Sequence, residues 1–163
     1  MKTLFSVRRL SLLIALCISS ILFLASCSKD NNDDNNGDTQ VYTTQGDATG
    51  SQQNPMVTTS GSARLAGTYD ASNNNWEYSI SWSSLTGTAS LIEFHGPADL
   101  GVNGALLFSV DITAGGSNGA ISATKTISEQ QEAYLRSGQV YYTIITTAHL
   151  SGEVRGQIYT LAR

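Results

Sequence analysis

The stretch Glu77-Tyr78-Ser79-Ile80-Ser81-Trp82-Ser83 alternates large apolar side chains with polar ones at every second position. Successive side chains of a β-strand point to opposite faces of a sheet, so this period of two predicts a strand with one buried face. We expect Tyr78, Ile80 and Trp82 to lie in a core and the serines between them to face solvent.

Further stretches of β-strand character lie on both sides of this one. They are separated by segments rich in glycine, asparagine and serine, such as residues 70–75 and 115–119. The other predicted strands cover residues 58–69, 89–95, 105–112, 120–127, 140–147 and 153–161. About seven strands within one domain, residues 56–163, are typical of an all-β protein with an antiparallel, Greek-key-like sandwich or barrel.

One short helix is predicted at about residues 129–136. Ser128 can cap its start, and Gln131 stands three residues later, which is the spacing of a capping box. Acidic side chains in the first turn favour the positive end of the helix dipole, and Arg136 favours the negative end. Gly138 then suits the end of the helix.

The N-terminal residues have the layout of a secretory signal peptide. A basic start precedes an apolar run at residues 10–24, and the small residues Leu24-Ala25-Ser26 lead to Cys27. This ending resembles a bacterial lipobox, in which the cysteine takes a diacylglycerol or palmitate-type lipid and the chain is cut just before it. An uncleaved membrane anchor is the alternative, but 15 residues fall short of the roughly 20 that a spanning helix needs. We predict a lipoprotein signal peptide at residues 1–26 and a lipid on Cys27.

Cleavage before Cys27 would remove three of the nine basic residues and none of the thirteen acidic ones, leaving a formal net charge of −7. Such a charge disfavours nucleic acid as a partner. Because Cys17 leaves with the signal and Cys27 carries lipid, we expect no disulfide. The predicted location is the cell envelope, anchored through the lipid to the outer membrane and facing the periplasm or the cell surface.

Residues 28–55 are mostly asparagine, aspartate, glycine, glutamine, serine and threonine. A segment with so few apolar side chains does not offset the entropy lost on ordering, so residues 27–55 are predicted to form a flexible tether. The acids Asp30, Asp33 and Asp34 resemble the surface-export tags of some bacterial lipoproteins. A solvated tether explains them equally well.

Two groups of motifs carry a resemblance to a known family. The first is Phe94-His95-Gly96-Pro97-Ala98 with Gly101-Val102-Asn103-Gly104, and the second ends in Gly152-Glu153-Val154-Arg155-Gly156-Gln157 after the capped helix and a tyrosine strand. With Gly67, Tyr69, Trp76 and Tyr78 upstream, residues 58–163 resemble a CHRD domain, a module named for chordin and found in microbial secreted proteins. The resemblance implies a β fold and an extracytoplasmic setting, and it implies no particular ligand.

Departures from the family pattern argue against a metal site in this chain. The family often has His-Ile-His where this chain has Glu93-Phe94-His95, and a His-Thr pair where it has Ile145-Thr146. Only His95 and His149 remain, so no transition metal and no cofactor are predicted. Weak calcium binding by Asp99 or Asp111 stays open, although neither is spaced as in an acidic calcium loop.

Four residues form the candidate site: Glu93, His95, Glu153 and Arg155. Glu93 and His95 are two apart on one predicted strand, and Glu153 and Arg155 are two apart on another, so each pair shares a face. The favoured interpretation is structural, with Arg155 paired to Glu153 or Glu93; ligand binding and catalysis are the alternatives.

The sequence contains no Gly-x-Ser-x-Gly nucleophile motif and no glycine-rich phosphate loop. The aromatic residues Trp76, Trp82, Tyr141 and Tyr142 could form a sugar-binding platform, but core packing is the favoured interpretation. We therefore predict a non-catalytic binding or structural module with an envelope protein or glycan as partner. The alternative function is a metal-binding or redox protein of the envelope.

Overall fold

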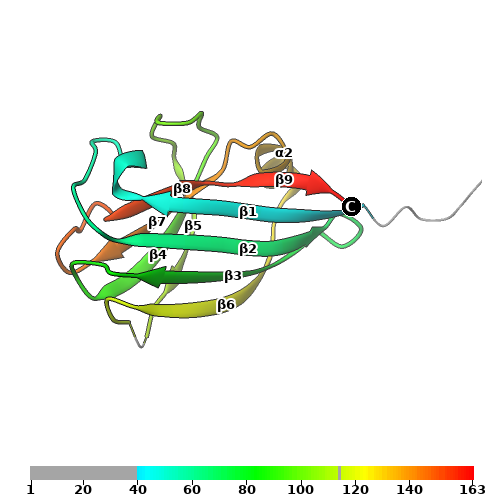
Figure 1. Cartoon of the computed structure of the whole chain (residues 1–163). Helices are drawn as coiled ribbons and strands as arrows, with labels where there is room; N and C mark the ends of the chain where they lie inside the picture. Colours follow the sequence, from blue (N-terminus) through cyan, green and yellow to red (C-terminus); the bar gives the residue numbers. More distant parts are fainter. Residues whose placement is uncertain (1–39, 114) are drawn as a thin grey trace, which may run out of the picture. The chain divides into compact units, whose positions relative to one another are not determined.

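The computed structural model describes residues 40–113 and 115–163 (Figure 1). The predicted signal peptide, Cys27 and residues 28–39 of the predicted tether lie outside the described residues. The elements in order are β1 (Val41–Thr49), η1 (Gly50–Gln52), β2 (Ser62–Asp70), β3 (Asn75–Ser83), β4 (Ala89–His95), β5 (Leu106–Asp111), β6 (Gly119–Thr126), α2 (Glu129–Arg136), β7 (Tyr141–Thr146), β8 (Val154–Gln157) and β9 (Tyr159–Ala162). No helix in this part of the chain is long and apolar enough to span a membrane.

The strands form one antiparallel sheet that curls into a half-barrel (Figure 1). Its order is β5-β4-β7-β8-β1-β2-β3-β6, and β9 pairs with β1 beyond the end of β8. The predicted all-β class is confirmed. The structure has nine strands where about seven were predicted, because the last predicted strand is divided into β8 and β9 and because β1 was not predicted.

Strand β1 corrects the predicted domain boundary. Its residues were assigned to the tether, yet β1 lies inside the sheet, with β2 along one side and β8 and β9 along the other. Its inward positions after Tyr42 are Thr44, Gly46 and Ala48, which are too small or too polar to stand out as a hydrophobic pattern. The domain therefore begins at or before residue 41, and not at residue 56.

Specific contacts explain the small inward residues of β1. The indole Nε1 of Trp76 donates a hydrogen bond of 3.0 Å to Thr44 Oγ1, and the Tyr142 hydroxyl donates one of 3.0 Å to the Gly46 carbonyl. A Cβ atom at Gly46 would lie 2.6 Å from the carbonyl oxygen of Gln157. Glycine at this position lets β1 and β8 pack closely.

Trp76, Trp82 and Tyr142, three of the four aromatic residues considered above as a possible sugar platform, lie in the core. Trp76, Trp82, Tyr141 and Tyr142 are all buried, which agrees with packing and leaves them no exposed ring face to offer a sugar. Trp76 makes an edge contact with Phe94, their ring centroids lying 5.4 Å apart. The interpretation as core packing is confirmed for Trp76, Trp82 and Tyr142, whereas Tyr141 is buried on the other face of the sheet.

Helix α2 spans the predicted residues 129–136. Ser128 Oγ accepts a hydrogen bond from the Gln131 backbone N–H, and the Gln131 side chain accepts one from the Ser128 backbone N–H, so both arms of the capping box are present. Gly138 follows with a positive φ of 71°, a conformation that favours glycine. The helix and the strand β7 after it place Tyr141 next to the candidate site.

Candidate functional site

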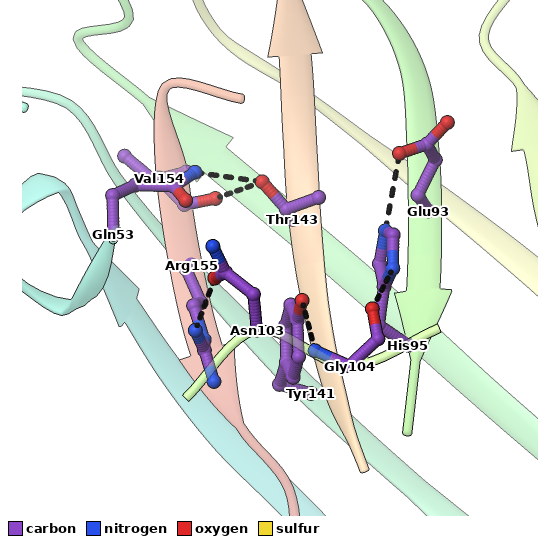
Figure 2. Close-up of polar contacts among 9 residues, drawn as sticks. All are labelled: Gln53, Glu93, His95, Asn103, Gly104, Tyr141, Thr143, Val154 and Arg155. Carbon is purple, nitrogen blue, oxygen red and sulfur yellow. Dashed lines mark hydrogen bonds and ion pairs between the residues drawn. The ribbon is translucent and has the colours of Figure 1, made fainter. Parts of the chain in front are cut away.

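Three side chains from neighbouring strands stack on one face of the sheet (Figure 2). The rings of His95 and Tyr141 are nearly parallel, with an interplanar angle of 6° and centroids 5.0 Å apart. The guanidinium carbon of Arg155 lies 3.5 Å from the centroid of the Tyr141 ring. We call His95, Tyr141 and Arg155 the stack; its members come from β4, β7 and β8.

Strand register produces the stack. His95 is directly opposite Tyr141 in the β4/β7 pair, and Tyr141 is opposite Gln157 in the β7/β8 pair, which places Arg155 diagonally across from Tyr141. Diagonal neighbours on one face are within reach of aromatic and long side chains. The face is the outer one, because Val154 and Ile158, which alternate with Arg155 and Gln157, are in the core.

His95 joins the stack to Glu93 and to the loop at residues 96–105. Its Nε2 lies 3.1 Å from Glu93 Oε2, and its Nδ1 lies 3.2 Å from the Gly104 carbonyl oxygen. A carboxylate and a carbonyl both accept hydrogen bonds, and a ring that carries a proton on each nitrogen donates to both. In that state Glu93 and His95 are an ion pair.

Arg155 is buried, with 1% of its surface exposed. Its Nη2 donates to the Val102 carbonyl at 2.7 Å, and its Nη1 donates to Asn103 Oδ1 at 3.3 Å. Burial lowers the pKa of the Arg155 guanidinium, and the nearby Tyr141 opposes that shift. The predicted pairing of Arg155 with Glu153 or Glu93 is wrong, because its partners are a loop carbonyl, an amide and an aromatic ring.

Glu153 directly precedes β8 and has a set of partners separate from that of Arg155. Its carboxylate accepts hydrogen bonds from the Thr59 hydroxyl at 2.7 Å, the Thr86 N–H at 2.7 Å, the Gly87 N–H at 3.3 Å and the Thr146 hydroxyl at 2.8 Å. Burial alone would raise the pKa of Glu153, but these hydrogen bonds outweigh it and lower the pKa to about 2. The ionised carboxylate thus ties the segments before β2 and before β4 to the β7/β8 turn.

The four predicted site residues therefore do not form one cluster in the structure. Glu93, His95 and Arg155 are connected through Tyr141, whereas the hydrogen bonds of Glu153 reach other segments. Sequence reasoning considered Tyr141 only for a sugar platform or core packing and assigned no role to Asn103, although both lie in motifs that carried the family resemblance. Membership in these motifs was the only sequence signal that Tyr141 and Asn103 gave. Nothing in the sequence indicated that they contact Arg155.

The loop at residues 96–105 lies over the outer face next to the stack. Besides the bonds from Arg155, the Gln157 side-chain Nε2 donates to the Ala98 carbonyl at 2.9 Å and to the Gly138 carbonyl at 2.7 Å. The Tyr141 hydroxyl accepts a hydrogen bond of 3.3 Å from the Gly104 N–H (Figure 2). Side chains of β7 and β8 therefore hold this loop at several points along its length.

The described residues contain no group of three or more histidine, cysteine, aspartate or glutamate side chains placed to hold a metal ion. Glu93 and His95 are adjacent but are only two groups. His149 lies elsewhere, in the wall of a small pocket with Pro55, Val57 and Leu150. Asp99 accepts a hydrogen bond from Gln139 at 3.4 Å.

The family model of the CHRD domain matches residues 44–158. This match covers more than half of the chain, so the chain belongs to the CHRD domain family. The match begins inside β1, in agreement with the corrected domain boundary. No curated protein and no solved structure matches the chain.

Proposed function

We propose that this chain is a lipid-anchored lipoprotein of the cell envelope whose CHRD domain is a non-catalytic binding and structural module. The observation that supports the module's role is the direction of its polar contacts. Arg155, Glu153 and His95 direct their hydrogen bonds to loop backbone atoms and to neighbouring side chains. A catalytic acid, base or nucleophile instead has to reach a substrate atom.

These contacts hold three loops in place on a rigid sheet. Arg155 holds residues 102–103, His95 holds Gly104, and Glu153 holds the segments at residues 59 and 86–87. Loops positioned by a rigid scaffold are where proteins most often carry binding residues. The partner is an envelope protein or a glycan that contacts these loops.

The anchoring part of the proposal rests on the sequence around Cys27. Because β1 begins at Val41, thirteen residues separate Cys27 from the first strand, and not the 28 residues of the predicted tether. Even fully extended, thirteen residues reach at most about 45 Å. The anchored domain therefore stays close to the outer membrane.

Membrane fractionation of Cys27→Ser tests the anchor, with Cys17→Ser as the matched control. Cys27→Ser should remove the lipid, detected by mass spectrometry of the N-terminal peptide, and should release the chain or leave an unprocessed precursor. Cys17→Ser lies in the segment that is cut away, so the mature protein should be unchanged. Unlipidated wild-type protein of mature length in the membrane pellet would overturn the anchor.

A further inference from the structure

Four exposed apolar side chains gather on three neighbouring loops. Met56 is 70% exposed, Leu100 66%, Val102 53% and Leu150 79%. They lie in the segments 53–57, 100–103 and 149–152, which we call together the tip surface. Single exposed apolar residues are ordinary, whereas a group on adjoining loops marks an interaction site.

Hydrogen bonds and a shared pocket show that the three segments adjoin. The Asn54 side chain donates to the Gly101 carbonyl at 2.9 Å, and the Asn103 side chain donates to the Asn54 carbonyl at 2.8 Å. The segments 53–57 and 149–152 together line a cavity of about 170 Å³, whose apolar walls include Pro55, Val57 and Leu150. Leu100 and Val102 flank Gly101 and so lie beside the same group.

Hydrogen bonds to residues of the sheet hold two segments of the tip surface in place. Asn103 accepts a hydrogen bond from the buried Arg155, and the Gln53 side chain donates one of 2.7 Å to Thr143 on β7 (Figure 2). These contacts hold the loops in the conformation that exposes the apolar side chains. Such preorganisation reduces the conformational entropy lost on association.

The tip surface carries a projecting side chain and a matching cavity side by side. Met56 projects between Pro55 and Val57, two of the residues that line the cavity. Beside these apolar walls, the cavity is also lined by Gln53, Asn54, His149 and Ser151. A methionine side chain is unbranched and adapts to such a space.

We propose that the tip surface is an interface between two copies of this chain. The Met56 side chain and the cavity lie next to each other. A twofold axis through the tip surface therefore lets Met56 of each protomer enter the cavity beside Leu150 of its partner. Reciprocal insertion of this kind is what an isologous twofold interface requires, and it closes without forming a filament.

Charge favours a second copy as the occupant. The expected mature chain has a formal net charge of −7, so most of its surface repels another copy. The three segments of the tip surface contain no aspartate, glutamate, lysine or arginine, so two copies meet there without opposing like charges. The chain's own residues 28–39 offer no large apolar side chain to fill the cavity.

The tip surface lies at the opposite end of β1 from the point where the chain enters the domain. The chain enters the domain at Val41, at one end of β1, and segment 53–57 follows η1 at the other end (Figure 1). Nine strand residues place these ends roughly 27 Å apart.

Disulfide trapping of the full chain in bacterial cells tests the interface. Ser151→Cys places a thiol beside the cavity and leaves Met56 and Leu150 intact, whereas Ser79→Cys places one on the exposed face of β3. The parent chain, with its own cysteines only, gives the background. After oxidation with copper phenanthroline, Ser151→Cys should yield at least about tenfold more disulfide-linked homodimer than Ser79→Cys.

A second variant links the trapping to Met56. Adding Met56→Asp to Ser151→Cys should lower the homodimer yield about tenfold or more, the effect expected when one buried apolar side chain is lost from an interface. Equal yields from Ser151→Cys and Ser79→Cys, no response to Met56→Asp, or a cross-link to a different protein would each overturn the interface. Because every variant keeps Cys27, the result does not depend on the Cys27→Ser fractionation.

Discussion

The guanidinium carbon of Arg155 lies 3.5 Å from the centroid of the Tyr141 ring, and the guanidinium donates hydrogen bonds to Val102 and Asn103. A buried cation in this setting is stabilised by a ring face and by loop oxygens, and within residues 40–113 and 115–163 no carboxylate forms an ion pair with it. Arg155 therefore links the sheet to the loop at residues 96–105. The loop depends on the planar, multiply donating guanidinium, which lysine lacks.

Arg155→Ala should lower the free energy of unfolding by roughly 2 to 4 kcal/mol, the combined scale of two hydrogen bonds to a charged group and a buried cation–π contact. Arg155→Lys should recover only part of this loss. Arg64→Ala is the matched control, because Arg64 and Asp47 form an exposed pair at 3.5 Å and its removal should cost under about 1 kcal/mol. Denaturant unfolding measures all three, and equal losses for Arg155→Ala and Arg64→Ala would contradict the structural role.

Glu153 should make the domain sensitive to acid. Its pKa is lowered from 4.5 to about 2, so the stability that the ionised carboxylate provides is complete above about pH 4.5 and is lost as the pH falls toward 2. Glu153→Gln should remove that step from the stability profile and should cost on the order of 1 to 3 kcal/mol at pH 7, because donors around it lose their acceptor.

Thermal melts of wild type, Glu153→Gln and Glu77→Gln between pH 2 and pH 7 measure this effect. Glu77 is exposed on β3, so Glu77→Gln should follow the wild-type profile. A wild-type profile parallel to that of Glu153→Gln over the whole range would show that Glu153 does not couple folding to pH.

Local signals in the sequence predicted the fold best. The capping box of Ser128 and Gln131 involves residues three apart, and its geometry follows from the helix alone, so α2 was predicted at the residues where it occurs. The alternation around Ile80 likewise predicted β3, because a strand with one buried face needs nothing beyond its own side chains to show the pattern.

Features that depend on distant partners were not predicted. Strand β1 is stabilised by pairing on both sides and by contacts of Trp76 and Tyr142 with its small inward residues, none of which its own composition reveals. The two-residue spacing predicted that Arg155 and Glu153 share a strand face. Such a prediction does not say how far apart the guanidinium and the carboxylate lie. One partner of Arg155 is the backbone carbonyl of Val102 in the loop at residues 96–105, and a backbone acceptor has no sequence signature.

Truncation should show that β1 is required for folding. A fragment of residues 56–163 lacks the strand that joins β2 to β8 and β9, and it leaves two strand edges unpaired in the middle of the sheet. Residues 38–163 keep β1 and should give a β-type circular dichroism spectrum with a cooperative melt, whereas residues 56–163 should give neither. A cooperative melt of the shorter fragment would contradict the central role of β1.

His95→Ala should weaken the domain without changing its metal content. Zinc sites in proteins use three or four protein ligands, and in the described residues His95 has only Glu93 beside it as a second candidate ligand. The role seen for His95 is to stack on Tyr141 and to hold Glu93 and the Gly104 carbonyl, so its loss should cost about 1 kcal/mol or somewhat more.

Two measurements on wild type and His95→Ala separate the structural role from metal binding. In the structural case, the variant melts at a lower temperature and calorimetric titration with zinc or copper gives no binding of micromolar affinity to either protein. Glu93→Gln is the matched control, because it keeps a hydrogen-bond acceptor for His95 and removes the charge. If wild type instead bound one metal equivalent at micromolar affinity and both variants lost it, Glu93 and His95 would be ligands, and the envelope metal-binding function would replace the structural one.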